Sequence, residues 1–345
     1  MNTILVTGAN GHVGCHLVRA CRDAGHRSIA FVRRGSDRRG LRGVEVELRE
    51  GDLLDAASVR AAMAGVDVVL HAGAVHRNWA ADADAISRPA IEGTRNVLAA
   101  AGTRRIVYCS TGATIGFADA VDKPLDESAS LATAKSAYIR GKIEAEKLAL
   151  EAAARGQDVV VLNPSGIFGP RDYRLTPATR AVMGLLQGDP AFIGVCFTDV
   201  RDVARAHVAA IDQGRRGERY LVTGDPLAPA QVAALFADVA GIKPPTIRPP
   251  TWLLKFLVGR MEKKAAATGG DAPASRDAID DLGKRHLVYD SGKSRRELGM
   301  SYRAARDVLV DACRWLLHVN ALAPKVAAKV RAKLGDRAAP DADWG

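Results

Sequence analysis

A tyrosine and a lysine, Tyr138 and Lys142, stand four residues apart in the segment Tyr-Ile-Arg-Gly-Lys. Side chains at this spacing share one face of a helix. A tyrosine hydroxyl is too weak an acid to work readily at neutral pH, and it needs a neighbouring cation that stabilises the phenolate. Because Lys142 can supply that cation, the pair is a candidate for acid–base chemistry.

A glycine-rich turn near the start of the chain is a second candidate. The short apolar run from Ile4 to Val6 predicts a buried strand, and Gly8, Gly11 and Gly14 then punctuate a turn that opens a helix. Such glycines permit a tight turn, a close approach of the backbone to a pyrophosphate and close packing of helix on strand, with the anion on the free N–H groups of the helix. The turn therefore predicts a dinucleotide site that includes Gly8, Asn10, Gly11, His12, Val13 and Gly14.

Strands and helices alternate through the first two thirds of the chain. Apolar runs predict strands over 28–32, 44–48, 66–71, 105–109 and 158–162, with helical segments between them. Alternation of this kind builds a parallel sheet with right-handed crossovers. We expect an α/β Rossmann fold, a doubly wound parallel sheet, with a smaller C-terminal substrate-binding domain.

The expected domains divide the chain near residue 223. Residues 1–223 would form the NAD(P)-binding Rossmann domain, with 163–191 contributing to the substrate pocket, and residues 224–320 would form the substrate-binding domain. Ala265–Ser275, rich in Ala, Gly and Pro, predicts a flexible loop or lid. Residues 321–345 predict a basic amphipathic helix and a disordered tail. The helix could touch a membrane, although we favour packing on the protein itself or on a partner subunit.

The order of these motifs resembles the extended short-chain dehydrogenase/reductase superfamily, the NAD-dependent epimerase/dehydratase family. The resemblance runs from residue 1 to about residue 222 and is greatest to dihydroflavonol-4-reductase-like enzymes and hopanoid-associated sugar epimerases. It implies an enzyme in which Thr111 holds the substrate oxygen, with Ser110 beside it as a less favoured substitute. Tyr138 would exchange a proton with that oxygen, while Lys142 lowers the pKa of Tyr138 and binds the nicotinamide ribose.

The resemblance also implies contacts with the cofactor. They involve Asp52 and Leu53 at the adenine, His71, Ala72 and Gly73 beside the cofactor, and Ser110, Tyr138, Lys142, Asn163 and Pro164 near the nicotinamide. In the family, the backbone near the proline meets the carboxamide group.

The end of the second predicted strand bears on cofactor choice. An NAD site usually has an acidic residue there, which binds the ribose 2′-hydroxyl. This chain instead offers Arg33, Arg34 and Ser36, which suit a 2′-phosphate. NADP(H) is therefore favoured, and the nearby Asp37 leaves NAD(H) open.

Composition excludes several classes of protein. The net charge of +10 is spread over 345 residues without aromatic interleaving, so we expect no nucleic-acid partner. The five cysteines are scattered and predict neither a disulfide framework nor a metal site. No apolar run is long enough to span a bilayer. We expect a cytoplasmic enzyme, and the resemblance implies a homodimer.

The predicted function is an NADPH-dependent reductase of a ketone or aldehyde, an oxidoreductase with a small-molecule substrate that could be hydrophobic. A sugar-nucleotide epimerase is the alternative, with Arg171, Arg180 and Arg201 available to a diphosphate. A non-catalytic nucleotide-sensing protein on the same fold is the third hypothesis. The loop that carries His76, Arg77, Asn78 and Trp79 could meet the substrate.

Overall fold

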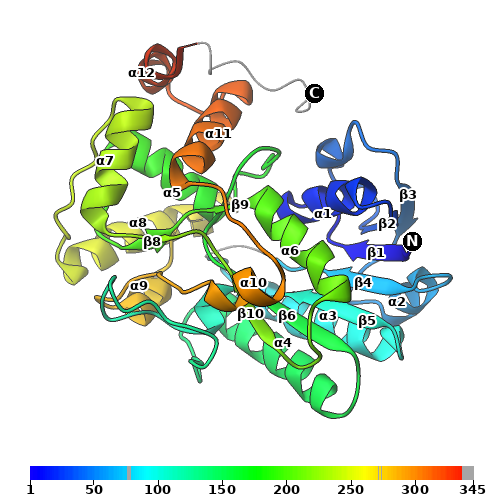
Figure 1. Ribbon diagram of the computed structural model, residues 1–345. Coiled ribbons are helices and arrows are strands. Elements are labelled where there is room, and N and C mark those ends of the chain that lie inside the picture. Colours follow the sequence, from blue (N-terminus) through cyan, green and yellow to red (C-terminus); the bar gives the residue numbers. More distant parts are fainter. Residues whose placement is uncertain (76–78, 271, 273, 336–345) are drawn as a thin grey trace.

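A parallel sheet forms the centre of the computed structural model, which describes residues 1–75, 79–270, 272 and 274–335 (Figure 1). Seven strands pair in the order β3-β2-β1-β4-β5-β6-β10, all parallel. They are β1 (Thr3–Thr7), β2 (Arg27–Val32), β3 (Glu47–Glu50), β4 (Val68–His71), β5 (Arg105–Cys109), β6 (Val159–Pro164) and β10 (Arg219–Val222). The strand order reverses between β1 and β4, and doubly wound folds bind ligands at the carboxyl ends of the strands beside such a point.

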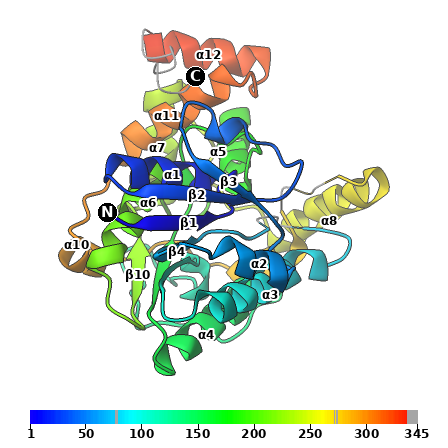
Figure 2. The same cartoon turned by 90° about the vertical axis from the view of Figure 1, so that its right-hand side faces the viewer.

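Alternation of apolar side chains gives the sheet two buried faces. In β1, Ile4 and Val6 contact one hydrophobic cluster and Leu5 contacts the other, as the two-residue period of a strand requires. Helices α1 (His12–Asp23) and α6 (Val200–Asp212) cover the first face, and α2 (Ala56–Ala62), α3 (Asp84–Ala101) and α4 (Ala137–Ala154) cover the second (Figure 2). The expected doubly wound fold is confirmed.

A third hydrophobic cluster lies outside the sheet. It buries Val182, Phe236, Leu309 and Val330, one from each of four helices. These helices are α5 (Pro177–Gln187), α7 (Pro229–Ala240), α11 (Ala305–His318) and α12 (Pro324–Leu334). Two short ladders join this part to the sheet region, β7 (Ile167–Phe168) with β9 (Thr198–Asp199) and β8 (Val195–Cys196) with β11 (Pro226–Leu227). The remaining helices are α8 (Thr251–Thr268), α9 (Arg276–Leu282) and α10 (Gly292–Glu297).

Two sequence expectations of local structure need correction. The third strand spans Glu47–Glu50 rather than 44–48, because Val44 and Val46 pack against the core from an irregular segment and the edge strand itself is polar. The expected loop at Ala265–Ser275 is helical through Thr268, where α8 continues along its alanines, which are good helix formers.

The apolar stripe of α12 is directed into the protein. Ala327, Val330 and Leu334 are buried in the cluster that also contains α7 and α11. Packing within the chain therefore accounts for this stripe. No helix in the described part of the chain is both long enough and apolar enough to cross a membrane. The expected tail after residue 335 lies outside the described residues.

Candidate active site

The turn between β1 and α1 has room only for glycine at two positions. Gly8 adopts φ +65°, and a Cβ atom placed on it would lie 2.7 Å from the Cα atom of Gly73. A Cβ atom on Gly14 would lie 2.1 Å from the carbonyl oxygen of Gly8. Helix α1 then begins after Gly11 without a side-chain cap, which leaves its first N–H groups available to an anion. The turn therefore has the open backbone cradle that a pyrophosphate needs.

Polar contacts fix the loops beside this cradle. The amide of Asn10 donates to the Asp37 carbonyl oxygen at 2.8 Å and so joins the glycine turn to the segment after β2. The Asp37 carboxylate accepts hydrogen bonds from the Arg39 side chain at 2.8 to 3.2 Å, and these bonds lower its pKa. Arg33 and Arg34 are exposed, and no hydrogen bond or ion pair joins their side chains to any residue that the structure describes.

The residues predicted to lie along the adenine and ribose meet at the ends of β1, β3 and β4. Leu53 packs against Gly73, whose Cβ position would lie 2.5 Å from a methyl group of Leu53. The Asn96 amide donates to the Leu53 carbonyl oxygen at 2.7 Å. Asp52 is exposed, and its carboxylate caps the N–H group of Leu54 at 2.9 Å. The backbone of this corner is therefore held in place from α3.

His71 lies beneath this corner and does not face solvent. Its ring nitrogens lie 2.7 Å from the Thr7 hydroxyl and 3.1 Å from the Thr94 hydroxyl. Burial lowers the pKa of His71 to about 3, so the imidazole is neutral at physiological pH. Its side chain thus braces β1, β4 and α3, and only its backbone, with Ala72 and Gly73, is placed to meet a cofactor.

The structure brings Thr111, Tyr138 and Lys142 together. Thr111 directly precedes the 3₁₀ turn η2 (Gly112–Thr114) beyond β5, and Tyr138 and Lys142 lie in the first two turns of α4. Burial raises the pKa of Tyr138, while the charge of Lys142 and a hydrogen bond with Thr111 lower it. The ammonium of Lys142 is buried and donates to the Cys109 carbonyl oxygen at 2.6 Å and to the Tyr108 hydroxyl at 3.2 Å. A phenol, a hydroxyl and a cation therefore share one corner of the sheet edge.

A buried carboxylate that the sequence did not reveal lies behind these groups. Glu146 accepts hydrogen bonds from the Thr114 hydroxyl at 2.7 Å, from the Asn163 amide at 2.8 Å and from the Ser110 hydroxyl. It also pairs with Arg219 at 3.3 Å. Glu146 follows Lys142 by four residues, so the spacing from Tyr138 to Lys142 continues one turn further along the same face.

Two of the residues that were predicted to contact the cofactor make side-chain hydrogen bonds to Glu146. The Ser110 hydroxyl points to Glu146, and the Asn163 amide donates to Glu146, to the Thr114 hydroxyl at 3.0 Å and to the Thr111 carbonyl oxygen at 3.2 Å. Both side chains therefore support the strand end that carries Thr111. Pro164, the last residue of β6, is buried beside them.

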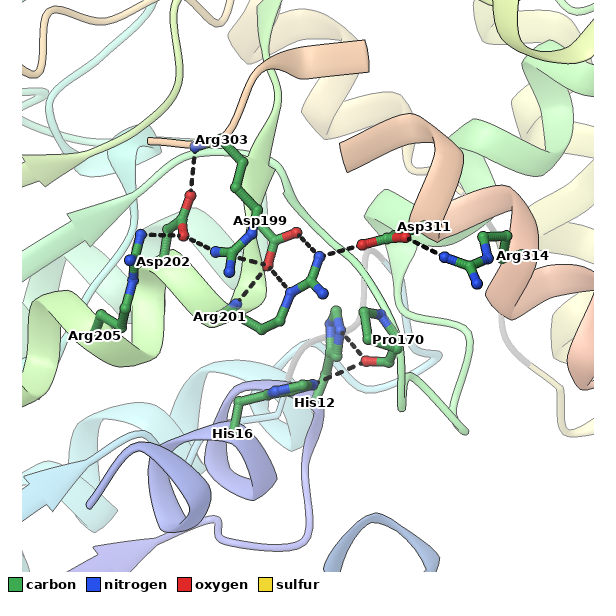
Figure 3. Close-up of polar contacts among 10 residues, drawn as sticks. All are labelled: His12, His16, Pro170, Asp199, Arg201, Asp202, Arg205, Arg303, Asp311 and Arg314. Carbon is green, nitrogen blue, oxygen red and sulfur yellow. Dashed lines mark hydrogen bonds and ion pairs between the residues drawn. The ribbon is translucent and has the colours of Figure 1, made fainter. Parts of the chain in front are cut away.

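Two histidines of α1 connect the glycine turn to the segment after β7. The Nε2 atoms of His12 and His16 each lie 3.1 Å from the Pro170 carbonyl oxygen (Figure 3). A carbonyl only accepts, so each ring donates through Nε2. Burial lowers the pKa of His16 to about 3. Arg171, the next residue after Pro170, is buried with φ +64°.

Arg201 belongs to an internal ion-pair network (Figure 3). Its guanidinium contacts Asp199 at 2.6 Å and also pairs with Asp311 of α11. Asp199 is buried and caps α6. Two carboxylates of the protein therefore already neutralise the arginine that the sequence offered for a diphosphate. Arg180 lies half-buried on α5, and of the loop at 76–79 only Trp79 is among the described residues.

Comparisons with known proteins identify several similar sequences. The sequence model of the NAD dependent epimerase/dehydratase family matches residues 4–223. A Synechocystis protein provisionally named dihydroflavonol 4-reductase is 33% identical over 90% of this chain and 93% of its own. Sterol demethylase protein B of Methylococcus capsulatus is 33% identical, over 91% and 98%. A 4-hydroxy-2-methyl-3-oxo-4-farnesyl-3,4-dihydroquinoline-1-oxide ketoreductase of Stigmatella aurantiaca is 30% identical, over 90% and 95%.

Solved structures share the fold over nearly the whole chain. The crystal structure of gox2253 superimposes with a TM-score of 0.79 at 30% identity, covering 94% of this chain and all of the other. A nucleoside-diphosphate-sugar epimerase from Pseudomonas aeruginosa gives a TM-score of 0.72 at 26% identity, covering 93% of this chain and 99% of its own. Proteins named as reductases and as epimerases thus both occur among the relatives of this chain.

Proposed function

Because the chain belongs to the NAD-dependent epimerase/dehydratase family and is an NAD(P)-dependent oxidoreductase of the extended short-chain type, we propose that it reduces a ketone or aldehyde with NADPH. The observation that carries the proposal is the meeting of Thr111, Tyr138 and Lys142 beside the glycine turn. A carbonyl oxygen placed against the Thr111 and Tyr138 hydroxyls would receive two hydrogen bonds. Both bonds strengthen as charge develops on that oxygen.

The residues divide the work of this reaction. NADPH, when bound at the turn of Gly8 to Gly14, supplies the hydride that forms the new C–H bond. Tyr138 donates its phenolic proton to the substrate oxygen, which becomes the alcohol. Lys142 stabilises the phenolate that remains on Tyr138. Thr111 holds the oxygen in place throughout.

The segment after β2 supports NADPH over NADH. Arg33 and Arg34 are exposed and would meet the 2′-phosphate as donors. Asp37, the acidic residue that would favour NADH, already binds Arg39. A ribose 2′-hydroxyl would therefore compete with an internal salt bridge.

A hydrophobic substrate fits the surroundings of Tyr138. Its ring packs in a cluster with Phe117, Ile139 and Leu287, so the carbonyl would arrive through an apolar environment. The names of two relatives, the sterol demethylase protein and the farnesyl-quinoline-oxide ketoreductase, point in the same direction.

We further propose that residues 224–320 form the substrate-binding domain, together with 163–191 from the cofactor-binding domain of residues 1–223, and that the enzyme is a homodimer.

Sugar-nucleotide epimerisation is the second candidate, favoured by the likeness to the epimerase from Pseudomonas aeruginosa. An epimerase needs cations for the diphosphate, and Arg201 is engaged by Asp199 and Asp311. Arg180 on α5 would then carry most of that recognition. A nucleotide sensor without catalysis would not need the acid–base pair of Tyr138 and Lys142.

The fate of the cofactor distinguishes these functions. An epimerase regenerates its dinucleotide within each turnover, whereas a reductase exchanges it every cycle. The freshly purified protein is denatured and its released dinucleotide identified by mass spectrometry, and NADPH oxidation is then followed with a panel of apolar ketones and aldehydes. We expect an exchangeable site with higher affinity for NADPH. Stoichiometric retained NAD would favour the epimerase instead.

A further inference from the structure

Helix α8 exposes an unusual number of large apolar side chains. Trp252 is 70% exposed, Phe256 57%, Leu257 44% and Met261 45%. Ile247, just before the helix, is 80% exposed. Most of the large exposed apolar residues in the described part of the chain fall within this segment, so they are concentrated here rather than scattered over the surface.

One narrow face attaches this helix to the rest of the protein. Val258, Glu262 and Ala265 are buried. Glu262 pairs with Arg276 at 2.7 Å, and Lys255 pairs with Asp280 of α9 at 2.9 Å. The helix is thus held in a defined orientation, seen at the periphery of the molecule in Figure 2.

The apolar residues lie on both flanks of that attached face, around the exposed half of the helix. Trp252 and Phe256 are four residues apart and share one side of the helix, and Leu257 and Met261 share the other side. Arg260 and Lys264 lie between the two pairs around the helix axis. Among the residues that the structure describes, none covers these side chains enough to bury them. The exposed face therefore has the character of a contact surface without its partner.

Cations accompany the apolar side chains. Arg260, Lys263 and Lys264 are exposed, and their side chains form no hydrogen bond or ion pair with a described residue. The single carboxylate of the helix, Glu262, faces inward to Arg276. The exposed face thus carries positive charge and large apolar groups with no exposed negative charge, a combination that fits an anionic partner with an apolar interior.

We propose that the exposed face of α8, formed by Trp252, Phe256, Leu257, Met261, Arg260, Lys263 and Lys264, docks on the surface of an anionic lipid bilayer. Tryptophan and phenylalanine enter the boundary between headgroups and acyl chains, and aliphatic side chains enter with them. The long stems of lysine and arginine allow their charges to reach lipid phosphates. This inference goes beyond the proposed reaction and does not depend on it.

Charge argues against a second copy of the chain as the partner. A twofold contact through this face would place the two sets of Arg260, Lys263 and Lys264 near each other without an exposed carboxylate on either helix. Docking on a bilayer that contains anionic lipid involves no such repulsion between cations.

Helix α12 provides a natural comparison within the same chain. It also exposes cations, at Lys325, Lys329 and Lys333, but its apolar residues are buried in the protein. It can attract an anionic surface but has nothing to insert. A contrast between α8 and α12 therefore separates docking from mere charge attraction.

Vesicle flotation of the full-length protein tests the proposal. Vesicles of phosphatidylcholine alone are compared with vesicles that also contain phosphatidylglycerol. We expect the protein to float with the anionic vesicles. The double variant Trp252→Ser, Phe256→Ser should lose about tenfold or more of this binding, and so should Arg260→Gln, Lys263→Gln, Lys264→Gln. The matched variant Lys325→Gln, Lys329→Gln, Lys333→Gln should bind nearly as the wild type does.

Circular dichroism and the melting temperature report folding of each variant. Should the tryptophan variant melt early, Leu257→Gln with Met261→Gln takes its place. Failure of the wild type to float with either vesicle overturns the proposal. Equal losses in the α8 and α12 variants also overturn it, because charge alone then explains binding. A dimer that the Trp252 and Phe256 substitutions convert to monomer, without vesicle binding, would assign the face to a second copy.

Discussion

Lys142 donates a hydrogen bond of 2.6 Å to the carbonyl oxygen of Cys109 at the end of β5. The bond fixes the ammonium beside Tyr138, where its charge opposes the rise in pKa that burial causes. Lys142→Met should lower kcat by about a hundredfold or more, since a cation that supports proton transfer is lost. Steady-state NADPH oxidation measures the change. Lys147→Met, at an exposed position of the same helix, should leave kcat unchanged.

Tyr138→Phe removes the proton donor and should lower kcat by about 10²- to 10⁴-fold. The dissociation constant for NADPH, measured by fluorescence, should change little. Because burial raises the pKa of Tyr138, the phenol stays protonated through neutral pH, and wild-type reduction should decline only on the alkaline side. Tyr302→Phe serves as the control. Full turnover in Tyr138→Phe would refute the mechanism.

Glu146→Gln should show that this carboxylate positions the active site. The substitution keeps the shape of the side chain but removes its pairing with Arg219 and weakens the bonds from Ser110 and Thr114. We expect a loss of about 1–3 kcal/mol in the free energy of unfolding and a fall in kcat larger than any change in the KM for NADPH. The control is Glu144→Gln, on the exposed side of α4. A rise in KM with unchanged kcat would contradict the role.

Cofactor preference should depend on Arg33 and Arg34. Replacing both with alanine removes one or two charge-assisted hydrogen bonds to a 2′-phosphate, so the KM for NADPH should rise about ten- to a hundredfold. The KM for NADH should stay nearly constant because NADH lacks that phosphate. Initial rates with each cofactor give the ratio. Arg22→Ala, on the exposed side of α1, should alter neither value, and parallel effects on both cofactors in the double variant would argue against the assignment.

Buried neutral histidines should make the protein acid-sensitive. Burial lowers the pKa of His71 to about 3 and of His207 to about 4. Above about pH 6.5 both the folded and the unfolded chain hold these rings neutral, so no stability is lost. As the pH falls from about 6.5 toward 4, only the unfolded chain gains protons, and each histidine removes about 1.4 kcal/mol per pH unit.

Urea denaturation at pH 7 and pH 5 measures this dependence. His207→Gln should show a shallower loss between the two pH values than the wild type. His318→Gln, at an exposed site, should follow the wild-type curve. An identical slope in His207→Gln would mean that His207 titrates normally in the folded state.

Local patterns in the sequence predict most of the sheet. Runs such as Val159–Val161 are wholly apolar, since strands of a parallel sheet are buried on both faces, and they predict their own structure. The edge strand β3 was misplaced because its residues, Glu47 to Glu50, are mostly polar and resemble a loop. The end of α8 was missed because alanine and glycine together are typical of both a helix end and a flexible segment.

The candidate site shows a similar division. Tyr138 and Lys142 were identified because both lie on one helix and their spacing is readable. Glu146 was not, because its partners Ser110 and Arg219 come from distant segments and meet it only after folding. Arg201 could not be recognised as an internal ion pair for the same reason, since Asp311 lies 110 residues further along.

The obstacle at Gly14 is the backbone itself. A Cβ atom there would lie 2.1 Å from the carbonyl oxygen of Gly8. Every amino acid has this carbonyl group, so a substitution at position 8 would not remove it. Crowding between side chains can be relieved by a compensating mutation, but crowding against the main chain cannot. In evolutionary terms we therefore expect reversion, rather than a second-site suppressor, to be the usual route by which a lineage that loses Gly14 recovers the turn.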